Sequence, residues 1–226
     1  MNAHLRKDME KLKSQILTLA ALVEDNVRRS IIALRELSPQ LAKDAVKADR
    51  KIDETEVEIE EECLKILALH QPVARDLRFV VTVLKINNEL EHIGDMAANI
   101  AKRVPHILAE IKIPFDIDTM TSLAIQMLKN SLDAFLSADE ILALKVCRDD
   151  DAVNDENRKC YINVEKFIRH SPMDTMAYLN YLLVCRSIER IGDLCTNIAE
   201  DVIYMKRSII VRHNIADAEK QILQEK

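Results

Sequence analysis

The chain has 226 residues, 48% of them hydrophobic, which is enough for one sizeable core or for two small ones. Its formal net charge of −6, without clustered lysine and arginine, argues against the basic surface that nucleic-acid binding needs. Two glycines, no tryptophan and 31% charged residues are typical of an all-α protein.

Neither a signal peptide nor a membrane span is visible, because no segment approaches the roughly 20 apolar residues that cross a bilayer. We therefore expect a cytoplasmic protein. The cysteines are odd in number, lack Cys-x-x-Cys spacing and lie mostly among apolar neighbours, so we expect reduced core side chains. They are Cys63, Cys147, Cys160, Cys185 and Cys195.

Apolar residues recur at spacings of three and four along the first half of the chain, the pattern of amphipathic helices. We expect these helices at residues 5–34, from 40 to just before the break at His70, and at 74–103. Pro39 and Pro72 separate them, and Pro105 and Pro114 follow the third. The two closely spaced prolines predict a linker.

The same order of helices returns after Pro114, at residues 118–136, 139–170 and 173–212. Ser171 and Pro172 punctuate the second half where Gln71 and Pro72 punctuate the first. The pattern therefore predicts an all-α protein made of two units of three helices. We expect the units at residues 1–110 and 111–226.

Matching residues support this internal repeat. In the first two helices of each unit the matches are 101 positions apart (131 − 30), and they pair Ser30, Ala33, Leu41, Ala42 and Asp49 with Ser131, Ala134, Leu142, Ala143 and Asp150. In the third helices the offset is 98 (189 − 91), and it pairs Glu91, Gly94, Asp95 and Asn99 with Glu189, Gly192, Asp193 and Asn197. Both copies carry the motif Glu-x-x-Gly-Asp.

Gly94 and Gly192 are the only glycines in the chain, and both lie in this motif. A glycine inside a helix is about 1 kcal/mol less favourable than alanine. Close approach of a neighbouring helix or of a ligand is the usual reason to keep one there. We therefore expect something to lie against the backbone at both positions.

The motif also places two carboxylates on one helix face, since Glu91 and Asp95 are four residues apart, with Asn99 one turn further. An apolar stripe runs beside them, and uncompensated charge next to it is unfavourable by several kcal/mol. A bound cation would compensate the charge. Glu189, Asp193 and Asn197 predict a second such site.

The second helix of each unit offers further ligands, Asp49 and Asp53 in the first and Asp150 and Asn154 in the second. If the second and third helices run antiparallel, the acidic pairs converge on one site per unit. Carboxylate and amide oxygens suit Mg, Mn or Fe, and Zn less well. The alternative is a solvated acidic face, because Asp53 opens a run of glutamates that extends to Glu62.

Other chemistry finds less support. Glu89-x-x-His92 resembles half of a di-iron motif, but the second unit has Ser187 and Arg190 at these positions. No glycine-rich phosphate loop and no nucleophile–base pair is visible. Two alternatives stay open: a carboxylate-bridged metal hydrolase or oxidase, and a metal-free bundle in which the glycines serve only helix packing.

The motifs resemble the two signature segments of the PhoU family. The resemblance rests on Gln71-Pro-Val-Ala-Arg-Asp-Leu-Arg78 with Glu91-His-Ile-Gly-Asp95, and on Arg186-Ser-Ile-Glu-Arg-Ile-Gly-Asp193 with Asn197. It covers nearly the whole chain, including its length and its repeat order. It implies two tandem three-helix bundles related by an internal pseudo-twofold axis.

The resemblance also implies multinuclear metal clusters held by (Glu/Asp)-x-x-x-Asp motifs, with Fe, Mn, Mg or Zn as the metal. Carried over by position, the ligands are Asp49, Asp53, Glu91 and Asp95 in the first unit, and Asp150, Asn154, Glu189 and Asp193 in the second. Asn154 replaces an expected aspartate, which implies a weaker second site. His92 replaces a usual arginine, which alters a surface contact.

The function that the resemblance implies is regulation without catalysis. PhoU proteins look like adaptors that link the ATPase subunit of the phosphate ABC transporter to the phosphate sensor histidine kinase of a two-component system. They lower uptake and signalling when phosphate is plentiful. The resemblance thus implies a cytoplasmic homodimer that reaches the inner membrane through its partners.

Overall fold

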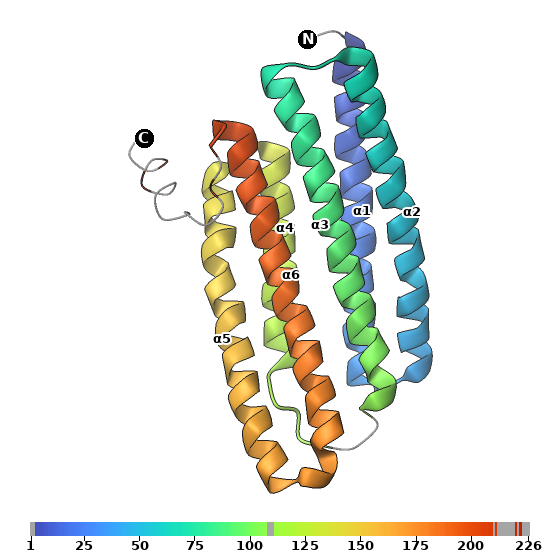
Figure 1. The fold of residues 1–226 in the computed structure, drawn as a ribbon, viewed down its shortest axis with the longest axis vertical. Helices are drawn as coiled ribbons and strands as arrows, with labels where there is room; N and C mark the ends of the chain where they lie inside the picture. Colours follow the sequence, from blue (N-terminus) through green and yellow to red (C-terminus); the bar gives the residue numbers. More distant parts are fainter. Residues whose placement is uncertain (1–2, 108–110, 210, 212–219, 221, 223–226) are drawn as a thin grey trace.

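The computed structural model describes residues 3–107, 111–209, 211, 220 and 222, and these form long α-helices without a β-strand (Figure 1). The helices are α1 (Ala3–Arg35), α2 (Pro39–His70), α3 (Ala74–Arg103), α4 (Ile117–Ser137), α5 (Glu140–His170) and α6 (Thr175–Arg207). Short 3₁₀ helices, η1 (Val104–His106) and η2 (Pro172–Asp174), lie between them. The all-α prediction is confirmed.

Two three-helix bundles lie side by side, one made of α1, α2 and α3 and the other of α4, α5 and α6 (Figure 1). Their main contact is between α3 and α6, whereas α1 and α4 touch more lightly. This arrangement confirms the predicted tandem bundles. The predicted boundary after residue 110 lies at the edge of residues 108–110, which are outside the described residues.

The helix ends follow from local capping. Ser38 accepts a hydrogen bond from Leu41 N at the start of α2, and Asp139 accepts two at the start of α5. The prediction that the last helix reaches Arg212 was wrong, since α6 ends at Arg207. Ser208 adopts a left-handed conformation with φ of 63° and donates its N–H to Tyr204 O, which terminates the helix.

The second helix was expected to end before His70, and α2 ends at His70 itself. Gln71 then caps it in a left-handed conformation and donates its N–H to Leu67 O. The cysteines fit the prediction, since all five are free thiols, four of them buried and Cys147 half-buried. In the described part of the chain, no helix is long and apolar enough to cross a membrane.

Helices α3 and α6 run antiparallel along the contact between the bundles. Lys85 Nζ lies 2.6 Å from Asp201 Oδ1, and Asn197 Nδ2 donates to Glu89 Oε2 at 3.3 Å. Successive contacts thus pair residues of increasing number on α3 with residues of decreasing number on α6. This geometry is what a twofold relation between the two repeats requires.

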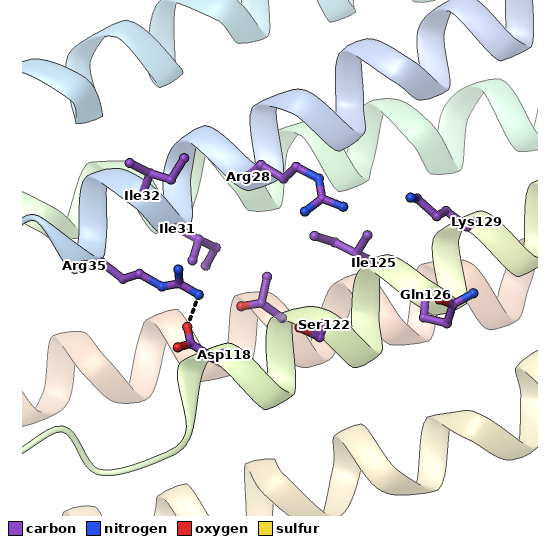
Figure 2. A pocket seen from close by; sticks show the side chains of 10 residues that line it. Arg28, Ile31, Ile32, Arg35, Asp118, Ser122, Ile125, Gln126 and Lys129 are labelled. Carbon is purple, nitrogen blue, oxygen red and sulfur yellow. Dashed lines mark hydrogen bonds and ion pairs between the residues drawn. The ribbon is translucent and has the colours of Figure 1, made fainter.

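The lighter contact, between α1 and α4, borders a hollow of about 370 Å³ (Figure 2). Arg28 and Arg35 reach it from α1, and Lys129 reaches it from α4. Carboxylates hold these cations, because Arg35 pairs with Asp118 while Arg28 and Lys129 both lie beside Glu24.

Candidate functional site

Both glycines lie where the third helix of a bundle packs against the second. A Cβ atom on Gly94 would lie 3.1 Å from Asp49 Oδ1, and one on Gly192 would lie 3.0 Å from Asp150 Oδ1. Both distances are shorter than ordinary van der Waals contact. The close approach predicted from the glycines is therefore that of the neighbouring helix, α2 in one bundle and α5 in the other. An aspartate carboxylate makes it in both bundles, and at Gly94 two Ile52 carbon atoms lie equally close, at 3.1 Å.

The two aspartate oxygen atoms that contact the glycines lack hydrogen-bond partners within the described part of the chain. Asp49 Oδ1 and Asp150 Oδ1 are buried, and neither has a hydrogen-bond partner among the described residues. The other oxygen of Asp150 accepts a hydrogen bond from Asn154 Nδ2 at 2.6 Å. A buried carboxylate oxygen without a donor is unfavourable, so each site lacks a positive or donating group at the same place.

The electrostatics of the two aspartates agree with this deficit. Burial, followed by repulsion from Asp53 and Asp95, raises the pKa of Asp49 from 3.8 to about 6, with Lys102 acting in the opposite direction. Burial and repulsion from Asp193 raise the pKa of Asp150 to about 6, although the hydrogen bond from Asn154 opposes them. Both bundles therefore concentrate negative charge at this point.

The glutamate of each motif belongs to the same group. Burial and then Asp95 raise the pKa of Glu91, with a smaller effect of Asp53 from α2. Burial and then Asp193 raise the pKa of Glu189, with a smaller effect of Asp150 from α5. The structure thus brings the acidic pairs of neighbouring helices together, as expected from an antiparallel arrangement.

The described residues contain no group of three or more His, Cys, Asp and Glu side chains already arranged to hold a metal ion. Asp53 is exposed and Asp95 is half-buried, and both lie close enough to the Asp49 carboxylate to raise its pKa. The orphaned oxygens and the raised pKa values fit a cation. Ligation by these residues stays a prediction.

The two asparagines of the motifs face the other bundle. Asn197 on α6 bonds to Glu89 on α3, and Asn99 on α3 lines a hollow shared with α6. Neither contact involves Asp49 or Asp150, the aspartates that lie against the glycines. The trailing asparagines therefore contribute to the bundle interface in this structure, while their expected role as metal ligands is untested.

Sequence reasoning missed some polar contacts of the site. Glu56 belongs to the acidic run that was expected to be mostly solvated, yet it is half-buried and accepts a hydrogen bond from Asn87 Nδ2 on α3 at 3.1 Å. The repeat offers a signal, since the matching positions, Asn157 and Cys185, are also in contact at 3.4 Å. The rest of the acidic run is mostly exposed, as predicted.

The fold and site define a duplicated helical-bundle protein with one acidic group per repeat. The family model described as the PhoU domain matches residues 16–104 and 117–202. The chain therefore belongs to the PhoU family.

Relatives and solved structures agree with this assignment. The chain is 31% identical over 209 residues to the "Phosphate-specific transport system accessory protein PhoU homolog 1" of Thermotoga maritima, covering 91% of this chain and 90% of the relative. It is 35% identical to the corresponding Pseudomonas aeruginosa homolog, covering 91% and 86%. The crystal structure of PhoU from Pseudomonas aeruginosa superposes with a TM-score of 0.85 at 34% identity, covering 90% of this chain and 99% of that one.

The glycine contacts predict unequal effects of alanine. At Gly94 the new Cβ would meet two Ile52 carbon atoms as well as Asp49 Oδ1, all at 3.1 Å, whereas at Gly192 only Asp150 Oδ1 is closer than 3.5 Å. We expect Gly94→Ala to lower the free energy of unfolding by about 1 kcal/mol, because overpacking exceeds the gain in helix propensity. We expect Gly192→Ala to change it less. Urea unfolding of metal-free protein measures both, and an equal or larger loss in Gly192→Ala would contradict the contact geometry.

The raised pKa values predict a pH dependence. The folded chain holds protons on Asp49 and Asp150 up to a pH of about 6, because their pKa values are raised, whereas the unfolded chain releases them near the ordinary pKa of 3.8. Their contribution to stability is therefore full below that lower value and is lost as the pH rises through about 6. We expect the double variant Asp49→Asn, Asp150→Asn to match the metal-free parent in acid and to exceed its unfolding free energy at neutral pH. A constant difference across the pH range would count against the shifts.

Proposed function

We propose that the protein is a regulatory adaptor of phosphate homeostasis and not an enzyme. It lowers uptake by the phosphate ABC transporter and signalling by the phosphate sensor kinase when phosphate is abundant. The observation that carries this proposal is the match of both repeats to the PhoU domain. Relatives that are 31% and 35% identical to this chain, over 91% of its length, are named as accessory proteins of phosphate-specific transport systems.

The shape of the molecule supports an adaptor, because its two ends carry exposed apolar side chains. Leu69 and Val73, at the connection between α2 and α3, are 69% and 75% exposed. Met173 and Met176, at the connection between α5 and α6, are 96% and 69% exposed. The two connections lie at opposite ends of the paired bundles (Figure 1). Two such patches suit two partners, which we propose are the transporter's ATPase subunit and the kinase.

Charged substitutions at these patches test the adaptor. We expect Val73→Glu and Met173→Glu to weaken capture of the ATPase subunit or of the kinase's cytoplasmic domain by at least tenfold, since each places a charge in an apolar contact. Ile162→Glu, on the outer face of α5 where Ile162 is 53% exposed, is the matched control.

A deletion strain tests the direction of the regulation. We expect it to express phosphate-regulated genes in high phosphate and to return to normal when the parent protein is supplied. Capture of neither partner together with an unchanged regulon would overturn the adaptor proposal. The adaptor in this proposal is a cytoplasmic homodimer, held at the inner membrane by its partners.

We further propose that each acidic group holds one or more cations, with Fe, Mn, Mg or Zn as candidates. In the first bundle Asp49, Asp53, Glu91 and Asp95 would hold them, and in the second Asp150, Asn154, Glu189 and Asp193. A bound cation supplies the positive charge that the buried aspartate oxygens lack. The second group has an amide in place of one carboxylate, so we infer that it binds fewer ions or binds them more weakly.

Elemental analysis of protein purified without affinity metals or chelators tests the cation proposal. We expect Asp49→Asn to remove more metal per chain than Asp150→Asn, because the first group has four carboxylates. The same metal content in both variants and in the parent would refute it. The alternative function, a carboxylate-bridged hydrolase or oxidase, predicts metal-dependent turnover in phosphatase or oxygen-consumption assays, and such turnover would replace the adaptor proposal.

A further inference from the structure

The contact between α3 and α6 is electrostatically complete in only one of its two halves. In the first half, the buried Asp201 pairs with Lys85 and the half-buried Glu89 accepts a hydrogen bond from Asn197. Both contacts join the two bundles. The repeat offers a direct comparison, because the offset of 98 positions maps each of these residues onto the other half.

The equivalent positions in the second half carry different chemistry. Leu183 and Arg103 replace Lys85 and Asp201, so the ion pair is lost and an arginine is left in place of an aspartate. Ser187 replaces Glu89 opposite Asn99, so the internal carboxylate is lost as well.

The second half has also gained positive charge beside these changes. Arg186 and Arg190 stand where the first half has Asn88 and His92. The contact thus has a carboxylate-filled half and an arginine-rich half.

A hollow of about 580 Å³ marks the place of the missing carboxylate. Asn99 and Arg103 line it from α3, and Arg186 and Ser187 line it from α6. The Ser187 hydroxyl already donates to Leu183 O at 3.0 Å, so this residue contributes space and not a hydrogen bond. The volume lies within the range of small-molecule sites.

The donors around the hollow are available to a ligand. Arg103, Arg186 and the Asn99 amide have no hydrogen-bond or ion-pair partner among the residues that the structure describes. Glu189 and Asp193 also border the hollow and oppose an anion, but Arg190 holds Asp193 at 3.1 Å. Arg186 and Arg190 also lie close enough to Glu189 to oppose the rise in its pKa. The lining therefore carries three guanidinium groups against two carboxylates, a net charge of +1 (3 − 2).

We propose that this hollow binds a phosphoryl group from solution, either inorganic phosphate or a small phosphate monoester. The phosphoryl oxygens fill the position that the Glu89 carboxylate fills in the first half of the contact. They accept hydrogen bonds from Asn99, Arg103 and Arg186. Planar guanidinium forks suit phosphate oxygens, and donors from two helices suit a tetrahedral anion better than a single carboxylate. Because Asn99 and Arg103 lie on α3 and Arg186 on α6, the ligand joins the two bundles.

The hollow between α1 and α4 is the main competitor, and its contacts argue against it. Its cations, Arg28, Arg35 and Lys129, are each paired with a carboxylate, as Figure 2 shows for Arg35 and Asp118. An anion there would have to displace existing ion pairs. Arg28 is therefore a suitable control position.

Calorimetric titration of the purified full chain tests the proposal, with inorganic phosphate in one arm and glucose 6-phosphate in the other, both against sodium chloride of equal ionic strength. Binding in either arm is expected, and the stronger arm identifies the source of the phosphoryl group. Ser187→Glu restores the internal carboxylate and should weaken binding at least tenfold. Arg103→Gln and Arg186→Gln should each weaken it about tenfold, whereas Arg28→Gln should leave it unchanged.

Circular dichroism shows whether each variant is folded. If Ser187→Glu does not fold, the two arginine variants still test the proposal. Binding in neither arm would overturn the proposal. Unchanged binding in the folded variants of the hollow, or equal loss in Arg28→Gln, would overturn it as well. The titration needs neither transporter nor kinase, so its outcome is independent of the adaptor proposal.

Discussion

In each bundle, one aspartate oxygen is pressed against the bare backbone of a glycine, and the rest of the acidic group is arranged around that contact. Asp49 meets Gly94, and Asp150 meets Gly192, at distances that no side chain larger than hydrogen accommodates without movement. The contact places the second helix so close to the third that their acidic pairs fall within one electrostatic neighbourhood. It also takes the aspartate oxygen out of water without giving it a donor. A bound cation would neutralise the crowded carboxylates and would also coordinate the buried oxygen, so it is the simplest group that fits both features.

The two repeats share this contact and differ around it. The first group has four carboxylates, whereas in the second Asn154 bonds to Asp150 and supplies part of the missing compensation. The bundle interface is unequal in a different way, since one half is filled by Glu89 and the other is hollow and lined by arginines. The described residues thus form two related acidic groups and an arginine-lined hollow in one half of the contact between α3 and α6.

Much of the fold was predictable because helical periodicity and proline breaks are local signals. Spacing within the chain predicts the six long helices and their duplicated order. It also predicts that a neighbouring group lies close to the backbone at Gly94 and Gly192. The end of α6 was not predictable in the same way, since apolar residues continue past Arg207 while Ser208 turns the backbone left-handed. Periodicity states which face of a helix is buried, but it does not state which other helix covers it. The contact of Asn197 with Glu89, across the two bundles, was missed for that reason.

In our proposal, Asp49 and Asp150 are cation ligands at the centre of the two acidic groups. Anomalous diffraction from crystals of the full chain, soaked in manganese, tests it most directly. We predict a peak beside Asp49 Oδ1 and another beside Asp150 Oδ1, with the stronger peak in the first bundle. Well-ordered aspartates without a peak at either position, or peaks only at other places on the molecule, would contradict the account.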